Sequence, residues 1–146
     1  MVIRKMTEAD LDQVLAIENE TFSDPWSKDD FRNSLLDDKN DYLVVDIDGK
    51  IAGYCGFWGV LEEGDIFNVA VKKEYRRQHI GETMLKALLE IGLSRGITSF
   101  TLEVRCSNEP AIRLYETLGF TSAGIRKDFY SKPKEDAVIM WLNTIQ

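Results

Sequence analysis

A cationic turn between an apolar strand and a long amphipathic helix has the residue types that could bind a chain of phosphates. The turn holds Lys72, Lys73, Arg76 and Arg77, four of the eighteen Lys and Arg in a chain of formal net charge -7. At a helix start, about four backbone N–H groups lack an intrahelical partner, and the helix dipole adds roughly half a positive charge. The segment therefore predicts a polyphosphate site, with a solvated surface turn as the alternative.

Length and composition limit the classes of protein that this turn could serve. The chain has 146 residues, 44% hydrophobic and 29% charged, which is typical of a single domain, 1–146, with its own core. No apolar run nears the ~18 residues of a membrane span and the N-terminus lacks the layout of a signal peptide, so we expect a cytoplasmic protein without a membrane partner. A pI near 4.8 argues against direct nucleic-acid binding and favours a basic partner.

Metal ligands are scarce in this chain. Its two cysteines, Cys55 and Cys106, are isolated and are better interpreted as free thiols in a reducing compartment than as a disulfide. His79 is the single histidine, so no cluster of His and Cys is available. We therefore expect no metal site.

Hydrophobic spacing and turn signals predict a mixed α/β order. Thr7 and Asp10 have the spacing of a capping box before a first helix, and Ser27 has the hydroxyl to cap a second. The first helix carries Leu11, Val14, Leu15 and Glu18 at helical spacing, and the other expected helices are 81–95 and 108–118. The expected strands are 2–5, 42–47, 50–59, 66–71, 98–104, 120–125 and 137–142.

Three connections between these elements bear on a site. The dipeptide Asp48-Gly49 predicts a tight hairpin. Strands 66–71 and 98–104 are joined through a full helix, which predicts parallel neighbours and puts the cationic turn at the carboxyl end of the first strand, where open α/β sheets bind ligands. The aromatics Phe22 and Trp26 flank Pro25 in a loop, where they either anchor the loop to the core or line a substrate entrance.

The nature of the phosphate ligand follows from a family resemblance. Neither a Walker motif nor a complete Gly-x-Gly-x-x-Gly occurs, so ATP hydrolysis and dinucleotide chemistry lack their fingerprints. Residues 76–81, Arg-Arg-Gln-His-Ile-Gly, resemble the Gln/Arg-x-x-Gly-x-Gly/Ala loop of the GNAT superfamily of N-acetyltransferases. The blocks that resemble the bacterial RimI branch, which acetylates the N-terminal alanine of a small-subunit ribosomal protein, are 25–27, 102–108, 111–120 and 135–140.

This resemblance implies a fold, a cosubstrate and an acceptor. The fold would be α/β with a central mixed, mostly antiparallel sheet of about six to seven strands and about four flanking helices. Acetyl-CoA would be the donor, and the N-terminus of a basic small-subunit ribosomal protein would be the acceptor. A lysine or small-molecule acetyltransferase, or a non-catalytic acyl-CoA-binding module, are the alternatives. His79 departs from the family pattern, because it stands where the family's first loop glycine would be.

The resemblance also assigns roles to particular residues. Glu103 would accept a proton from the amine and Tyr115 would donate one to the departing thiolate, whereas from the residues alone they are a paired strand carboxylate and a core aromatic. Trp26 and Tyr130 would line the acceptor slot. A catalytic role for His79 is not expected. The residues expected to bind acetyl-CoA are Val69, Ala70, Val71, Arg76, Arg77, Gln78, His79, Ile80, Gly81, Glu82 and Asn108.

Overall fold

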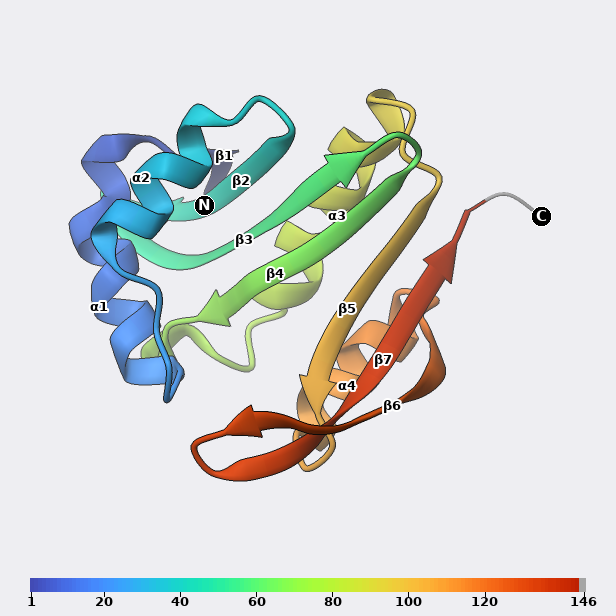
Figure 1. Ribbon diagram of the computed structural model, residues 1–146. Helices are drawn as coiled ribbons and strands as arrows, with labels where there is room; N and C mark the ends of the chain where they lie inside the picture. Colours follow the sequence, from blue (N-terminus) through green and yellow to red (C-terminus); the bar gives the residue numbers. More distant parts are fainter. Residues whose placement is uncertain (145–146) are drawn as a thin grey trace.

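A seven-stranded sheet forms the centre of the computed structural model, which describes residues 1–144, so that the last two residues of the expected domain lie outside it (Figure 1). The strand order is β1-β2-β3-β4-β5-β7-β6, and every neighbouring pair is antiparallel except β4 and β5. This is the mixed, mostly antiparallel sheet that was expected. The strands are β1 (Val2–Lys5), β2 (Asn40–Ile47), β3 (Lys50–Val60), β4 (Glu63–Val71), β5 (Ser99–Arg105), β6 (Thr121–Ser131) and β7 (Lys134–Asn143).

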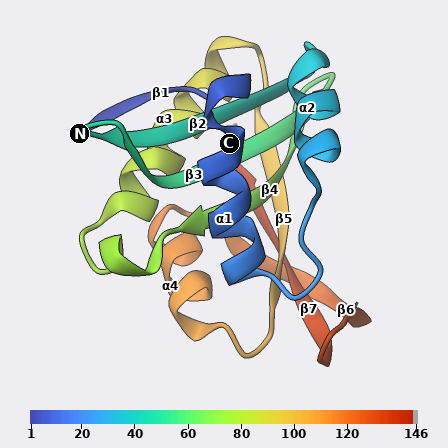
Figure 2. The same cartoon turned by 90° about the vertical axis from the view of Figure 1, so that its left-hand side faces the viewer.

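Helices cover both faces of the sheet, as Figure 2 shows from the side. One core cluster packs α3 and α4 against one face around Met84, Leu88 and Phe100, and the other packs α1 and α2 around Leu11 and Phe31 on the opposite face. No helix within residues 1–144 is long and apolar enough to cross a membrane. The helices are α1 (Leu11–Thr21), α2 (Lys28–Leu36), α3 (Ile80–Ser94) and α4 (Glu109–Thr117), with short 3-10 turns η1 (Glu8–Asp10) and η2 (Lys73–Tyr75).

Local signals in the sequence account for several element boundaries. The Ser27 hydroxyl accepts the Asp30 N–H at 3.1 Å, and the backbone N–H of Ser27 donates to the Asp30 carboxylate at 2.9 Å. This pair of bonds confirms the predicted start of α2. Asp48 and Gly49 both have positive φ, 52° and 86°, as a type I′ hairpin requires. Gly96, with φ 86°, follows α3 and ends it.

The parallel pair that was expected exists, but different residues form it. The ladder joins Glu63–Asp65 to Ser99–Thr101, so the paired part of β4 precedes the predicted strand 66–71. Beyond residue 65, β4 and β5 diverge, as their ribbons show in Figure 1. The prediction therefore named the correct pair of neighbouring strands but the wrong paired residues, and β4 begins three residues earlier than expected.

A β-bulge in β4 lies within this diverging part. Gly56 of β3 pairs with Phe67 and Tyr54 pairs with Ala70, so β4 has one residue more than β3 across this stretch. Asn68 in the bulge adopts a left-handed backbone with φ 56°. A bulge bends its strand and leaves the extra residue outside the regular ladder. The backbone of β4 is thereby turned at the place where β5 no longer pairs with it.

Candidate active site

A cavity of about 580 Å³ lies where β4 and β5 separate. Its wall includes the end of α1, the loop before α2, residues 66–69 of β4, residues 102–105 of β5, Tyr115 of α4 and the end of β6. Five of the predicted site residues meet here although they come from five separate segments of the chain: Trp26, Val69, Glu103, Tyr115 and Tyr130. The fold thus brings together five residues that the sequence analysis assigned to the site, and their roles stay predictions.

Glu103 reaches the cavity because the side chains of β5 alternate between the two faces of the sheet. Leu102 and Val104 are buried in the core, whereas Glu103 is 31% exposed as a side chain. Its Oε1 lies 3.5 Å from Nε of Arg126 on β6. Arg105, two residues further along β5, pairs with Glu135 at 3.1 Å. Glu103 is therefore both an ion-pair partner and an accessible carboxylate in the cavity wall.

Tyr115 lies on the inner side of α4, with its ring 5.9 Å from that of Phe120. Only 7% of the residue is exposed, and burial, followed by the effects of Cys55 and Tyr130, raises the pKa of its phenol well above the usual value of about 10. Its hydroxyl has no hydrogen-bond partner within residues 1–144. The hydroxyl is also not fully enclosed, because the one fully enclosed polar side-chain atom without a partner among those residues is Asn40 Oδ1. The hydroxyl is therefore an open, protonated donor at the cavity.

Two further aromatic residues, Trp26 and Tyr130, line the cavity. Trp26 packs against Phe31 and Phe67, with ring centroids 5.2 Å and 5.5 Å away, so it anchors its loop to the core and also lines the cavity. Tyr130 is stacked under the Arg105 guanidinium, 4.3 Å from the ring centroid. Partial burial raises the pKa of Tyr130 to about 12. The anchoring of the Trp26 loop to the core is thereby confirmed, whereas a role in substrate entry stays a prediction.

Arg105 links the two sides of this cavity. Its guanidinium donates to the carbonyls of Pro133 and Lys132 at 2.9 Å and 3.2 Å, which lie in the β6–β7 turn. It also donates to the hydroxyl of Ser23 in the loop before α2 at 3.3 Å. The walls that hold Trp26 and Tyr130 are in this way joined across one end of the cavity.

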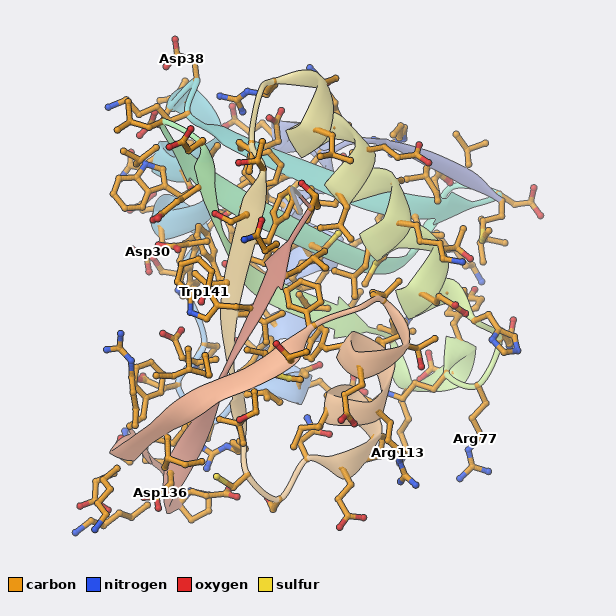
Figure 3. All side chains as sticks on the ribbon, turned by 90° about the vertical axis from the view of Figure 1, so that its right-hand side faces the viewer. Asp30, Asp38, Arg77, Arg113, Asp136 and Trp141 are labelled. Carbon is orange, nitrogen blue, oxygen red and sulfur yellow. The ribbon has the colours of Figure 1, made fainter. Side chains whose placement is uncertain are left out.

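The predicted anion loop, 76–82, lies outside the cavity lining, at the start of α3. His79 is the N-cap of α3 and has a left-handed backbone, φ 60°, with its side chain 87% exposed. Arg77 also has a positive φ, 66°, and its side chain extends away from the fold on the same edge as Arg113 in Figure 3. The Arg76 guanidinium donates to the carbonyl of Val71 at 3.1 Å, which ties the loop to the end of β4.

Asn108 caps α4, and its Oδ1 accepts the N–H of Ala111 at 3.3 Å. Like Ala70 and Val71, it does not line the cavity. Several polar residues that do were not assigned to the site by sequence reasoning, and Glu18 and Asn68 are among them. For Glu18 a signal existed, because a carboxylate at helical spacing with buried leucines must itself be buried.

No cluster of three or more His, Cys, Asp or Glu side chains able to hold a metal ion is present among residues 1–144. Both Cys55, which is buried, and Cys106 are free thiols. Acid–base and hydrogen-bonding groups are therefore the chemical resources that the described cavity offers.

Comparison with known proteins identifies the family of this chain. Residues 11–120 match the Acetyltransferase (GNAT) family. The [Ribosomal protein bS18]-alanine N-acetyltransferase of Escherichia coli K12 is 36% identical over 142 residues, covering 96% of this chain and 95% of the relative. A Bacillus subtilis protein that is provisionally given the same activity is 43% identical over 141 residues, covering 96% and 93%.

Solved structures agree with the sequence matches. The crystal structure of the E. coli ribosomal-protein-S18-alanine N-acetyltransferase superposes with a TM-score of 0.90 at 35% identity, covering 99% of this chain and 94% of that one. An aminoglycoside 6′-N-acetyltransferase complexed with coenzyme A shares the fold, with a TM-score of 0.85 at 14% identity. On its family match, its relatives and its fold, this chain belongs to the GNAT family of acetyltransferases.

Proposed function

We propose that this chain transfers the acetyl group of acetyl-CoA to the α-amine of an N-terminal alanine, on a ribosomal protein like the acceptor named for its relatives. The observation that carries the proposal is the meeting of Glu103 and Tyr115 in one cavity, where β4 and β5 separate. Similarity to the bS18-alanine N-acetyltransferases supports the choice of acceptor. Ribosomal proteins are made in the cytoplasm, which is where we expect the enzyme to act.

The chemistry requires a neutral amine and a proton for the leaving thiolate. The amine nitrogen attacks the thioester carbonyl, a C–N bond forms, and the C–S bond breaks. Glu103, directly or through a water, takes the proton that the amine loses, and Tyr115 donates a proton to the sulfur. An α-amine with a pKa of about 7.7–8.0 is roughly a tenth neutral at pH 7, so an exposed carboxylate suffices as its base.

The residues around the anion loop fit the phosphate end of acetyl-CoA, which supplies an activated acetyl thioester when bound. The N–H groups of Ile80, Gly81 and Glu82 belong to the first turn of α3 and lack helical acceptors. Arg76 and Arg77 add positive charge beside them. The backbone of 69–71, which β5 leaves unpaired, would hold the pantetheine and polarise the carbonyl, with Asn108 nearby.

The charges of the cavity support a cationic acceptor. Three carboxylates, Glu18, Asp24 and Glu103, line it against two cations, Arg105 and Lys132, within a chain of net charge -7. A protonated peptide terminus followed by basic residues is therefore attracted, whereas an acidic peptide is repelled. Trp26 and Tyr130 would contact the first residues of that peptide.

An acceptor panel tests the proposal. The protein is incubated with acetyl-CoA and peptides that begin with Ala, Ser, Met or Glu, with matched peptides whose α-amine is blocked and which carry lysine, and with spermidine. Mass spectrometry locates the acetyl group. We expect α-amine acetylation of the Ala peptide, weakened by added salt when basic residues follow. Preference for lysine in the blocked peptides, or for spermidine, would refute the acceptor assignment, and binding of acetyl-CoA without transfer to any amine would refute the enzymatic role.

A further inference from the structure

Glu18 is a carboxylate in the cavity wall that the proposed chemistry does not use. Only 2% of the residue is exposed, and among residues 1–144 no lysine, arginine or histidine forms an ion pair with it. A buried carboxylate is costly unless hydrogen bonds replace its hydration. The donors around Glu18 are therefore the reason that it can occupy this position.

Those donors come from three different elements. The Tyr54 hydroxyl of β3 donates to Oε1 at 2.6 Å, and the Trp26 backbone N–H donates to Oε2 at 3.0 Å. The side-chain amide of Asn68 lies 3.4 Å from Oε1 and 3.3 Å from Oε2. Every partner is a donor, so the arrangement fits an acceptor with two oxygens and no proton. One side chain thus connects α1 to the loop before α2, to β3 and to β4.

The contact with Asn68 bears on the thioester side of the cavity. Asn68 has a left-handed backbone in the bulge of β4, a conformation that asparagine tolerates better than most residues. Because Glu18 holds the side-chain amide of Asn68, the orientation of the peptide groups on either side of Asn68 is fixed. Residues 66–69 line the cavity, and these are the groups that face the space between β4 and β5.

The contact with Trp26 bears on the acceptor side. The N–H of Trp26 donates to the Glu18 carboxylate, and the N–H of Phe22, at the start of the same loop, donates to the Glu18 backbone carbonyl at 2.9 Å. Phe22, Ser23, Asp24 and Trp26 all line the cavity. A shift of the Glu18 carboxylate would therefore move both walls, because it is bonded to each.

We propose that Glu18 is a positioning residue, whose carboxylate holds the Asn68 kink of β4 and the Trp26 loop in the relative placement that brings thioester and amine together. The proposal rests on the proposed acetyl transfer and deepens it. This role requires no contact between Glu18 and either substrate. Glu18 acts through Asn68 on the donor side and through Trp26 on the acceptor side.

The test compares three variants of the full chain. Glu18→Gln keeps the shape but has a single acceptor oxygen, so an NH₂ group faces either Tyr54 or the pair Trp26 and Asn68. Asn68→Gly retains access to the left-handed backbone and removes the amide. Tyr54→Phe is the matched control, because it removes the shortest bond to Glu18 and leaves Asn68 and Trp26 in place. Each is measured for melting temperature, kcat, both KM values and the Kd of acetyl-CoA by calorimetry.

We expect Glu18→Gln and Asn68→Gly each to lower kcat at least tenfold and to raise the acetyl-CoA Kd at least threefold. Tyr54→Phe should lower the melting temperature while its kcat and Kd stay within threefold of the parent. In the double variant of Glu18 and Asn68, the loss of kcat should be smaller than the product of the two separate losses, since both act through one contact.

A purely structural role for Glu18 gives a different pattern. If Glu18→Gln loses melting temperature as Tyr54→Phe does, with kcat and Kd of both within threefold, the proposal is wrong. Should Glu18→Gln fail to fold, Asn68→Gly decides, and an unchanged kcat and Kd there overturn it equally. The Kd of acetyl-CoA is measured by calorimetry without an acceptor. If the alanine peptide is not acetylated in the panel, the acceptor assignment is therefore refuted, but the Kd values of the variants still test the role of Glu18.

Discussion

Arg126 on β6 reaches across to β5 and forms an ion pair with Glu103, with Nε 3.5 Å from Oε1. The ion pair places a positive charge beside the carboxylate that the proposed mechanism uses as the base. A positively charged amine arriving in the cavity would compete with Arg126 for the same oxygens. In the proposed mechanism, Arg126 is therefore a partner that the acceptor replaces.

Replacing Glu103 by Gln should lower kcat by about 10²–10⁴-fold at neutral pH, the usual range for loss of a general base. The loss should shrink as pH rises toward 9, because more of the α-amine is then neutral without help. Steady-state rates from pH 6 to 9 check this. A loss under about threefold across the range would remove the role given to Glu103.

Tyr115→Phe should slow the reaction by a constant factor between pH 6 and 9. Burial raises the pKa of Tyr115, so the phenol stays protonated throughout this range and its contribution does not titrate. The ratio of variant to parent kcat at each pH measures the effect. A ratio that climbs toward one at the alkaline end would mean that Tyr115 loses its proton there and that the raised pKa is not realised in the working enzyme.

His79→Gly should stabilise the protein and leave it active. A left-handed backbone costs a non-glycine residue about 1–2 kcal/mol, of which the extra freedom of glycine in the unfolded chain offsets a part. We expect a net gain of up to ~1 kcal/mol in denaturant unfolding, and a change in the acetyl-CoA KM of less than about tenfold. Gln78→Gly is the control, since Gln78 has no positive φ and should lose stability. Collapse of kcat at saturating acetyl-CoA would instead make His79 indispensable.

Arg77→Glu should weaken acetyl-CoA binding far more than His79→Gly does, by at least tenfold in Kd, because it puts a negative charge beside the helix N-terminus. Lys39→Glu makes the same change of net charge next to Asp38, at the opposite end of the fold in Figure 3, and should leave Kd within twofold. Calorimetry at low and physiological salt measures both. Equal effects of the two variants would show that only net charge matters.

Asp10 should support stability above pH 5 and lose this effect in acid. Its carboxylate accepts two bonds from Arg4, both 2.8 Å, and the guanidinium holds the pKa of Asp10 below its usual range. Because the folded-state pKa is depressed, the stabilisation is complete above the unfolded pKa of about 3.9 and disappears as pH falls through the folded value. Asp10→Asn should cost ~1–3 kcal/mol at pH 7 and little at pH 2.

Asp12→Asn provides the comparison for Asp10. The Asp12 side chain is 85% exposed and pairs with Lys28 at 3.0 Å. An exposed pair of this kind contributes ~0–1 kcal/mol. Urea unfolding of both variants at pH 7 and at low pH separates the two cases. Equal losses at pH 7 would contradict the assignment of the acid-sensitive contact to Asp10.

Local chemistry made much of the fold predictable from the sequence. Ser27 with Asp30, and Asp48 with Gly49, specify their structures through neighbouring residues alone, and both were predicted correctly. The start of β4 was missed because Glu63, Gly64 and Asp65 have the composition of a turn. Their pairing with β3 and β5 is a tertiary effect that overrides this local preference. β6 likewise continues past residue 125 to Ser131 through exposed residues with no hydrophobic pattern.

The site was predictable to the extent that it follows the family's motifs. Glu103 and Tyr115 were found because each stands in a motif block, and the cavity unites them. The cation that pairs with Glu103 could not be named from the sequence, since strand alternation does not tell which strand supplies it, and Arg126 comes from β6, beyond β7 in the sheet. Asn68 carries no sequence signal, because a bulge depends on how β3 and β4 align.

The two left-handed residues before α3, Arg77 and His79, determine when the loop acquires its shape. An unfolded or flexible chain seldom visits such backbone angles at non-glycine positions, so the loss of conformational entropy falls on folding and not on binding. An anion that meets this loop finds its N–H groups already aligned. The non-glycine residues Arg77 and His79 thus make the loop preorganised, whereas a more flexible glycine loop would have to be ordered with each turnover.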